Sequence, residues 1–188
     1  MPRILVVCTG NICRSPLIER VLQGALDQAY GPGAVEVSSA GTMGVVDSPM
    51  DERSAAILQE MGGDPAGFTA RRLTEGLLRD TELILTATRE HRAAVVRMHP
   101  KALRTAFTVR ELGHLAEQMD PTTLPTDPAE RLRAVAAQGV TLRGINAMLD
   151  PADLDVVDPY RRSDETYAVM RSQLEPALES ILGVLVPR

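Results

Sequence analysis

Two cysteines are all that this 188-residue chain contains, and both, Cys8 and Cys13, lie near its N-terminus. So low a cysteine content excludes a small secreted scaffold held together by disulfides and predicts a reducing compartment. Long apolar runs are also lacking, because the first one, from Ile4 to Cys8, covers only five residues. Such a run is too short for the core of a signal peptide or for a membrane span. We therefore expect a cytoplasmic protein that does not insert into a membrane.

An excess of positive charge is lacking as well. The 20 basic residues are outnumbered by 25 acidic ones, and the formal net charge is -5. Nucleic-acid binding depends on many basic side chains that face phosphates, so no nucleic-acid partner is expected. Lys101 is the only lysine in the sequence. Because the other basic residues are arginines, a single arginine is a weak indication of function unless its neighbours support one.

Length and composition indicate one globular domain. Hydrophobic residues make up 44% of the 188 residues and charged residues 24%, which is enough for a full core. The region at 119–154 is irregular, with prolines on both sides of a helical stretch near 129–137. We interpret it as an insertion beside a sheet, so that 1–188 forms a single domain. The expected assembly is a monomer or a weak dimer.

Strands and helices alternate along the chain. Short β-branched runs predict strands at 3–8, 35–39, 82–86 and 104–108, and helical spacing of apolar residues predicts helices at 52–61 and 89–97. Another helix should begin near Ser15, and a last one near Ser163, bent or interrupted at Pro176. This alternation predicts an α/β fold in which helices cover both faces of a parallel sheet.

The segment between the first strand and the first helix carries the clearest chemical signal. It reads CTGNICRSP, from Cys8 to Pro16, with five residues between Cys8 and Arg14. A loop that leaves a strand and enters a helix directs backbone N–H groups and the positive end of the helix at one point, which favours an anion. The same field stabilises a thiolate, which is the nucleophilic form of cysteine. We therefore interpret Cys8 as a nucleophile beside a phosphate site.

Other residues of this loop have expected roles. Arg14 is the expected phosphate clamp, because its planar guanidinium can hold two phosphoryl oxygens. Ser15 either donates a hydrogen bond to the Cys8 sulfur or simply caps the helix. Gly10 and Asn11 suit the left-handed conformations that a tight turn around an anion requires. The rest of the loop should help to line the site: Thr9, Ile12 and Cys13.

Two other interpretations of the cysteines are weaker. A cysteine at a strand end is more often a small buried hydrophobic residue, but Arg14 and a helix start beside Cys8 argue against that here. A zinc centre needs four ligands, and two cysteines without neighbouring histidine or carboxylate ligands do not supply them. We expect no metal and no cofactor. The histidines look like ordinary surface or helix-end residues: His91, His99 and His114.

The run VVCTGNICRSP closely resembles the N-terminal signature of the bacterial low-molecular-weight protein tyrosine phosphatases. The segment Val157-Asp158-Pro159-Tyr160 resembles the second signature of that family, a loop near the C-terminus. The resemblance implies a flavodoxin-like three-layer fold with a four-stranded parallel sheet of order 2-1-3-4. It also implies hydrolysis of phosphotyrosine through a cysteinyl-phosphate intermediate. In that reaction Asp158 protonates the leaving phenolic oxygen and then activates water.

The same resemblance implies supporting residues and a partner. Ser39 is expected to bond Asn11 and so to support the loop. Tyr160 should form one wall of the substrate cleft, opposite a wall at 43–45 that lacks the aromatic residue found in many relatives. The implied partner is a phosphotyrosine-containing protein, and a bacterial tyrosine kinase of capsule or exopolysaccharide synthesis is a candidate.

Three other functions fit the same loop. Arsenate reductases of the thiol-relay type need more cysteines than Cys8 and Cys13, so arsenate reduction here would require an external thiol. Phosphoarginine phosphatases tend to carry threonine in place of Ile12, whose apolar side chain suits a phenyl ring better than a guanidinium. A redox sensor without turnover could form a reversible disulfide between the two cysteines. A pure sensor would give Arg14 and Asp158 no purpose.

Overall fold

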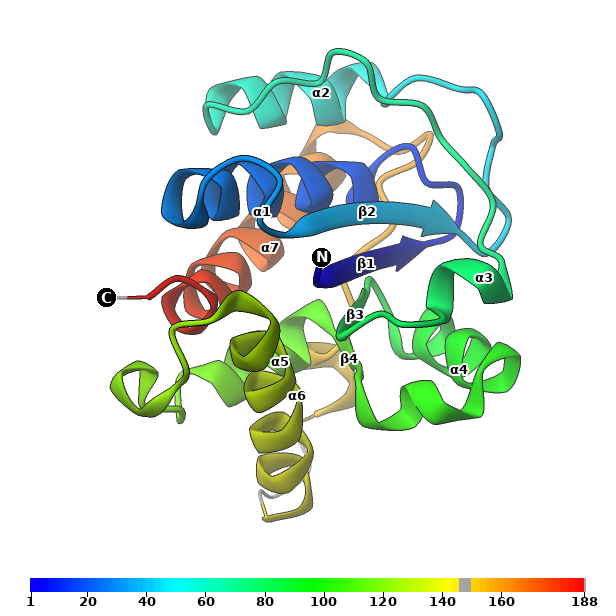
Figure 1. Ribbon diagram of the computed structural model, residues 1–188. Coiled ribbons are helices and arrows are strands. Elements are labelled where there is room, and N and C mark those ends of the chain that lie inside the picture. The colour runs from blue at the N-terminus through cyan, green and yellow to red at the C-terminus, as the bar shows by residue number, and fades with distance from the viewer. Residues whose placement is uncertain (146–149, 188) are drawn as a thin grey trace.

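The computed structural model describes residues 1–145 and 150–187. Four parallel strands form one sheet, which lies between two layers of helices (Figure 1). The strands are β1 (Arg3–Cys8), β2 (Glu36–Gly41), β3 (Leu83–Thr86) and β4 (Ala106–Thr108), in the order β2-β1-β3-β4. The α/β class and the sheet order expected from the sequence are confirmed.

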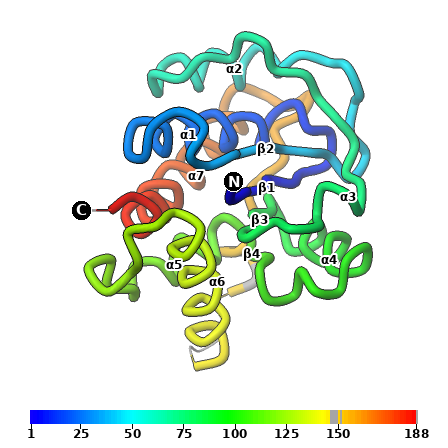
Figure 2. The backbone as a smooth tube through the Cα atoms, viewed as in Figure 1, coloured from blue at the N-terminus to red at the C-terminus, as the bar shows by residue number. Residues whose placement is uncertain are grey.

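Seven α-helices and three short 3-10 helices are assigned in the described part of the chain. The α-helices are α1 (Arg14–Tyr30), α2 (Glu52–Glu60), α3 (Glu75–Leu78), α4 (Arg89–Met98), α5 (Val109–Ala116), α6 (Pro128–Ile145) and α7 (Asp164–Leu185). The 3-10 helices are η1 (Pro100–Arg104), η2 (Pro121–Thr123) and η3 (Pro151–Asp153). Figure 2 shows the chain returning at α7 to lie beside α1, and the two helices are in contact.

Each face of the sheet has its own apolar core, because successive side chains of a strand point to opposite faces. Ile4 and Val6 of β1 belong to the larger core, with residues of α1, α5, α6 and α7. Leu5 and Val7 belong to a smaller core beneath α3 and α4. Burial on both faces explains why β1 reads as a continuous apolar run and not as an alternating one.

Most predicted elements lie within two residues of the observed ones, and α5 is the main omission. It follows β4 without a loop. Thr108 ends the strand and caps the helix: its hydroxyl accepts from the N–H of Glu111, and the Glu111 carboxylate accepts from the N–H of Thr108. This capping box was a readable signal, Thr-x-x-Glu before an apolar run, which the strand interpretation of 104–108 obscured.

The first and the last helix correct two further expectations. Ser15 does not cap α1, because the helix begins at Arg14 and Cys13 occupies the capping position without a side-chain bond. The hydroxyl of Ser15 is turned into the loop instead. The last helix is assigned as one continuous element through Pro176, so the expected interruption is wrong.

The segment at 119–154, interpreted as an insertion, contains η2, α6 and η3, and its residues 146–149 lie outside the described part of the chain. Helix α6 is longer than the predicted stretch at 129–137. Its Arg131 side chain is only 2% exposed. That side chain donates to five backbone carbonyls at 2.6–3.4 Å, those of Pro121, Leu124, Pro125, Val184 and Val186. Arg131 therefore ties the segment to the end of α7, where carbonyls have no partner within the helix.

Arg131→Met should lower the free energy of unfolding by about 3 kcal/mol, because it leaves buried carbonyls without donors while keeping most of the side-chain volume. Urea denaturation measures this change. Arg133→Met is the matched control: Arg133 lies on the same helix, is exposed and has no polar partner among the described residues. Its effect should stay within about 0.5 kcal/mol. Equal effects of the two variants would contradict the anchoring role.

Candidate active site

Residues from both sequence signatures meet at the carboxyl end of β1. They line a pocket of about 150 Å³ together with residues that follow β2. The lining residues are Cys8, Thr9, Gly10, Ile12, Cys13, Arg14, Met43, Val45, Asp158 and Tyr160. In parallel α/β sheets, ligands bind in crevices at the carboxyl ends of the strands, and this pocket has that position.

The loop from Thr9 to Cys13 is held from outside by the segment after β2. The N–H groups of Thr42, Met43 and Val45 donate to the carbonyl oxygens of Cys8, Thr9 and Gly10, each at 2.9 Å. The contact is close, since a Cβ built on Gly41 would lie 2.4 Å from the Thr9 carbonyl oxygen. A glycine is therefore required at 41.

Bonding of the carbonyls outward leaves the N–H groups of the loop available. Those of Thr9, Gly10, Ile12 and Cys13 have no acceptor among residues 1–145 and 150–187. Asn11 has a φ of 57°, the left-handed conformation expected of it. The same expectation was wrong for Gly10, which is absent from the residues with positive φ. Several free N–H groups in one turn at a helix start form an anion site.

The Cys8 sulfur receives two hydrogen bonds. The N–H of Asn11 donates to it at 3.3 Å, and the Ser15 hydroxyl lies 3.0 Å from it. That hydroxyl also accepts from the side-chain amide of Asn11 at 2.9 Å. Its own proton is then free to point at the sulfur, because a hydroxyl can accept and donate at once. Two hydrogen-bond donors therefore converge on this sulfur.

Asn11 organises a buried network behind the loop. Its amide donates to the Ser39 hydroxyl at 2.7 Å, so the pair expected from the resemblance is formed. Its carbonyl oxygen accepts from the N–H of Arg71 at 2.8 Å. Ser39 in turn donates to the carboxylate of Glu19 at 2.5 Å. Burial raises the pKa of Glu19 despite this bond. Sequence reasoning missed Glu19, although it lies one helical turn after Ser15.

Arg14 connects the loop to the second signature. Its side chain is 4% exposed, and its Nη2 lies 2.9 Å from a carboxylate oxygen of Asp158, whose side chain is 52% exposed. Its Nη1 donates to the carbonyl of Val156 at 3.0 Å. Its Nε is buried and has no partner in the described part of the chain. The Nε–H of this guanidinium can therefore donate to a further oxygen.

The segment that carries Asp158 is fixed on both sides. The N–H of Val156 donates to the carbonyl of Ala87 at 2.9 Å, and the N–H of Tyr160 donates to the Asp158 carboxylate at 3.2 Å. Upstream, Arg89 forms an ion pair with Asp155 at 3.0 Å. Although burial opposes the change, the hydrogen bonds from Arg89 lower the pKa of Asp155 below its usual value.

His91 corrects the expectation for the histidines. His99 at the end of α4 and the exposed His114 fit that expectation, but His91 is buried, with 6% of its surface exposed. Its Nε2 lies 2.8 Å from the Thr9 hydroxyl of the loop. Burial, and after it the charge of Arg14, lower the pKa of His91 to about 4. The position of Thr88 and His91 just after β3, at the same sheet edge as Cys8, was the signal available in the sequence.

Cys13 lies in a different environment from Cys8. Both are free cysteines, and the Cys13 sulfur is 3.9 Å from the hydroxyl of Tyr167. Burial, followed by the charge of Asp51, raises the pKa of Cys13 to about 12. Cys13 is therefore a thiol at neutral pH.

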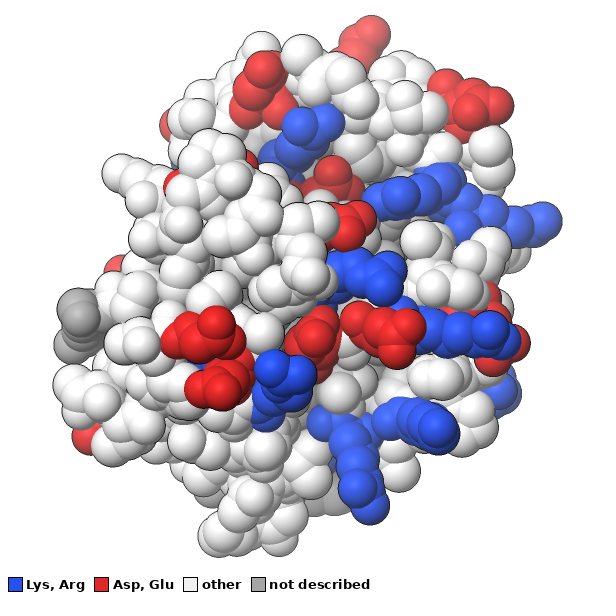
Figure 3. All heavy atoms as spheres, viewed as in Figure 1, with Lys and Arg blue, Asp and Glu red and all other residues white. Residues whose placement is uncertain are grey.

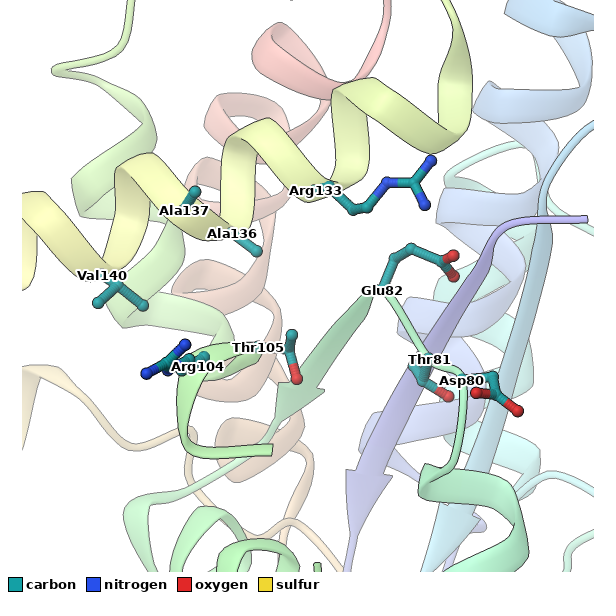
Figure 4. A pocket seen from close by; sticks show the side chains of 9 residues that line it. All are labelled: Asp80, Thr81, Glu82, Arg104, Thr105, Arg133, Ala136, Ala137 and Val140. Carbon is teal, nitrogen blue, oxygen red and sulfur yellow. The ribbon is translucent and has the colours of Figure 1, made fainter. Parts of the chain in front are cut away.

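A larger hollow, of about 850 Å³, lies at the amino ends of the strands, opposite the end that carries the Cys8 pocket (Figure 4). Its walls are α6 and the residues just before β3 and β4. Acidic and basic residues both line it, namely Asp80, Glu82, Arg104 and Arg133, and Figure 3 shows the two charges mixed over this face. Although this hollow is larger than the pocket beside Cys8, we do not assign it as the reactive site, because no cysteine or histidine lines it.

Two further properties concern the described residues as a whole. None of their helices has the length and apolar character needed to cross a membrane. No three histidine, cysteine or acidic residues among them lie close enough together to hold a metal ion.

Comparisons with known proteins agree on one family. Residues 3–131 match the family model described as "Low molecular weight phosphotyrosine protein phosphatase". The chain is 44% identical over 129 residues to the low molecular weight protein-tyrosine-phosphatase Etp of Escherichia coli K12, which covers 69% of this chain and 83% of Etp. It is 30% identical over 172 residues to a "Putative low molecular weight protein-tyrosine-phosphatase" of Klebsiella pneumoniae, with 92% and 89% covered. The crystal structure of the Erwinia amylovora tyrosine phosphatase AmsI superposes with a TM-score of 0.68 at 27% identity, covering 97% of this chain and 92% of AmsI.

Proposed function

The chain belongs to the low molecular weight protein tyrosine phosphatase family, and we propose that it hydrolyses phosphotyrosine in proteins through a cysteinyl-phosphate intermediate. Membership of this family confirms the expectation from the two signatures. One observation carries the finer proposal: the Cys8 sulfur, the Arg14 guanidinium and the Asp158 carboxylate converge on one pocket whose loop N–H groups have no other acceptor among the described residues.

In the first step, the phosphoryl oxygens accept hydrogen bonds from the loop N–H groups and from Arg14. The Cys8 thiolate attacks phosphorus, so an S–P bond forms as the bond between phosphorus and the phenolic oxygen breaks. The electron pair of that bond goes to the leaving oxygen, which takes the proton of the Asp158 carboxyl. The guanidinium fork and the N–H groups stabilise the charge spread over the equatorial oxygens.

In the second step, water attacks the phosphorus of the cysteinyl phosphate. The Asp158 carboxylate accepts a proton from this water, and the S–P bond breaks with its electron pair returning to sulfur. The Ser15 hydroxyl, 3.0 Å from the sulfur, favours this departure because it stabilises the thiolate that forms. Inorganic phosphate leaves, and both Cys8 and Asp158 return to their starting forms.

The mouth of the pocket favours a phenyl ring. Tyr160, which is 43% exposed, and Met43, which is 65% exposed, both line it. Ile12 and Val45 add aliphatic lining. Such apolar walls suit the ring of phosphotyrosine better than the guanidinium of phosphoarginine. Phosphotyrosine is therefore the substrate that fits these walls.

Ile12→Thr should lower kcat/KM for a phosphotyrosine peptide about tenfold, because it replaces apolar contact with a hydroxyl that the ring cannot satisfy. The ratio of phosphoarginine to phosphotyrosine hydrolysis should rise in this variant. Phosphate release from the two peptides measures the ratio. Val46→Thr makes a similar change at a residue that is 55% exposed and does not line the pocket, so its ratio should match that of the native protein. An unchanged ratio in Ile12→Thr would show that Ile12 does not select the substrate.

The deciding experiment compares phosphate release from phosphotyrosine, phosphoserine and phosphoarginine peptides by the native protein, in chelator and at mildly acidic pH. Turnover confined to phosphotyrosine supports the proposal. Turnover of phosphoarginine alone would retain the mechanism and change the substrate class. If folded, reduced protein releases phosphate from none of them, arsenate reduction with an external thiol or a Cys8/Cys13 redox sensor becomes the better explanation.

We also propose the setting in which the enzyme acts. Its physiological substrate would be a cytoplasmic phosphotyrosine protein, and a bacterial tyrosine kinase is a candidate because the relatives above come from bacteria. The chain would act as one domain over 1–188, as a monomer or a weak dimer, with 119–154 as an insertion. Sedimentation analysis of the purified protein tests the assembly, and a stable higher oligomer would contradict it.

A further inference from the structure

The proposed reaction uses Thr9 only for its backbone N–H, yet the Thr9 side chain has a buried partner of its own. The Thr9 hydroxyl lies 2.8 Å from Nε2 of His91, in the first turn of α4. The other ring nitrogen, Nδ1, lies 2.8 Å from the hydroxyl of Thr88, the N-cap residue of α4. A chain of three side chains therefore connects the phosphate loop to the helix that follows β3.

The direction of these hydrogen bonds follows from what each group already does. The Thr88 hydroxyl accepts from the backbone N–H of His91 at 3.3 Å, so its proton is available for Nδ1. Nδ1 is then the acceptor of the ring, and Nε2 carries the proton that it donates to the Thr9 hydroxyl. Both ring nitrogens have a hydrogen-bond partner in this arrangement. The imidazole is thus fixed in one orientation.

The ring also remains uncharged where the enzyme would work. Burial and the nearby Arg14 oppose its protonation, whereas Asp158 and Asp155 favour it, and the balance lowers the pKa of His91 to about 4. A neutral ring keeps its acceptor at Nδ1, so the chain of hydrogen bonds persists across the neutral and mildly acidic range. It also places no second cation beside the guanidinium that is to hold the phosphoryl group.

The loop needs such an anchor at this point. Gly10, the next residue, carries no side chain that could restrict rotation, and the Thr9 carbonyl is held only through the N–H of Met43 on the exposed side of the loop. On the inner side, the His91 contact is the hydrogen bond that fixes the Thr9 side chain. The bonded carbonyls of Cys8 and Thr9 already orient the N–H groups of Thr9 and Gly10, and the His91 contact adds a side-chain restraint at the same residue.

We infer that His91 is a positioning residue of the phosphate loop: through the Thr9 hydroxyl it orients the N–H groups that bind the phosphoryl oxygens. This inference rests on the proposed phosphate site. It assigns His91 a role in aligning donors with the substrate and not in proton transfer, because the ring contacts Thr9 and Thr88 and does not line the pocket. Misalignment of such donors costs binding and rate together.

The test uses two substitutions that keep different halves of the ring. His91→Gln carries its amide N–H at about the distance of Nε2, so it can still reach Thr9. His91→Asn reaches only the position of Nδ1 and can bond Thr88 but not Thr9. Isothermal titration with inorganic phosphate measures the loop without requiring turnover. We expect His91→Asn to weaken phosphate binding about tenfold and His91→Gln by less than about threefold, since a hydrogen bond to a charged site is worth about 1.5 kcal/mol.

The Thr9 side of the contact gives an independent check. Thr9→Val should weaken phosphate binding as much as His91→Asn, and Thr9→Ser should restore it. The double variant Thr9→Val/His91→Asn should bind phosphate no more weakly than either single variant, because both remove the same contact. Thr9→Val and Thr9→Ser also test the positioning role if His91→Asn fails to fold.

Other results would overturn the inference. Phosphate affinity of His91→Asn equal to that of the native protein would do so, as would equal losses in His91→Gln and His91→Asn or additive losses in the double variant. Native protein that binds phosphate but releases none from any phosphopeptide would instead refute the proposed phosphatase activity and leave the His91 inference standing on the binding data.

Discussion

Cys8→Ser is expected to abolish turnover, with a fall in kcat on the order of 10⁵-fold. Serine is close to cysteine in size, but its hydroxyl does not ionise near neutral pH and replaces sulfur as a far weaker nucleophile. The free N–H groups of the loop and the Arg14 guanidinium remain in place. The variant should therefore still bind inorganic phosphate, within about threefold of the native affinity by calorimetry. Loss of turnover with retained binding separates the nucleophile from the binding site.

Selective alkylation provides the control for this prediction. Cys13 has a pKa raised to about 12 by burial, so iodoacetate should label Cys8 first and phosphate should protect Cys8 from labelling. Peptide mapping by mass spectrometry distinguishes the two residues. Residual turnover above about 1% in Cys8→Ser, with the protein folded, would mean that another group attacks phosphorus.

The parts of this molecule that the sequence predicts well are those with local signals. The buried strand β1 and the loop from Cys8 to Arg14 are contiguous, and their residue types are dictated by burial on two faces and by an anion. The second signature was identified by resemblance, and the structure brings Asp158 within 2.9 Å of Arg14. Sheet order followed from the same resemblance. These features needed no knowledge of side-chain packing.

What sequence reasoning missed depends on contacts between distant segments. His91 and Glu19 are unremarkable in their own helices, and only the fold brings them to Thr9 and Ser39. For Ser15 the sequence left two interpretations open, and only the fold decides between them, by placing its hydroxyl beside the Cys8 sulfur. Helix α5 was lost for the opposite reason, since a strand pattern and a helix pattern meet at Thr108 without a loop between them.

The ion pair between Arg14 and Asp158 bears directly on the proposed reaction. In this form of the protein, the Asp158 carboxylate occupies one N–H position of the guanidinium, at 2.9 Å from Nη2. A phosphoryl group that uses the Arg14 fork competes with Asp158 for that position. Once displaced, the Asp158 side chain is free to face the leaving oxygen, where the proposed first step needs a proton donor. In the proposed reaction, substrate binding thereby releases the acid from its ion pair.

Asp158→Asn is therefore expected to change binding and rate in opposite directions. The kcat for a phosphotyrosine peptide should fall about 10³-fold, because the amide cannot protonate the phenolic oxygen. The loss should be clearly smaller for p-nitrophenyl phosphate, whose leaving group departs without a proton. Inorganic phosphate should bind about threefold to tenfold more tightly, because the competing carboxylate and its repulsion are gone. Steady-state kinetics and calorimetry measure the three quantities.

Asp153→Asn is the matched control, since Asp153 lies in the same stretch of chain, has a 66% exposed side chain and pairs with Arg110 away from the pocket. It should leave all three quantities unchanged. Weaker phosphate binding by Asp158→Asn would mean that the ion pair serves mainly to hold Arg14 in place. Equal losses with both leaving groups would mean that Asp158 does not donate the proton. Tighter binding together with a loss that depends on the leaving group is the combination that only a displaced carboxylate acting as the acid produces.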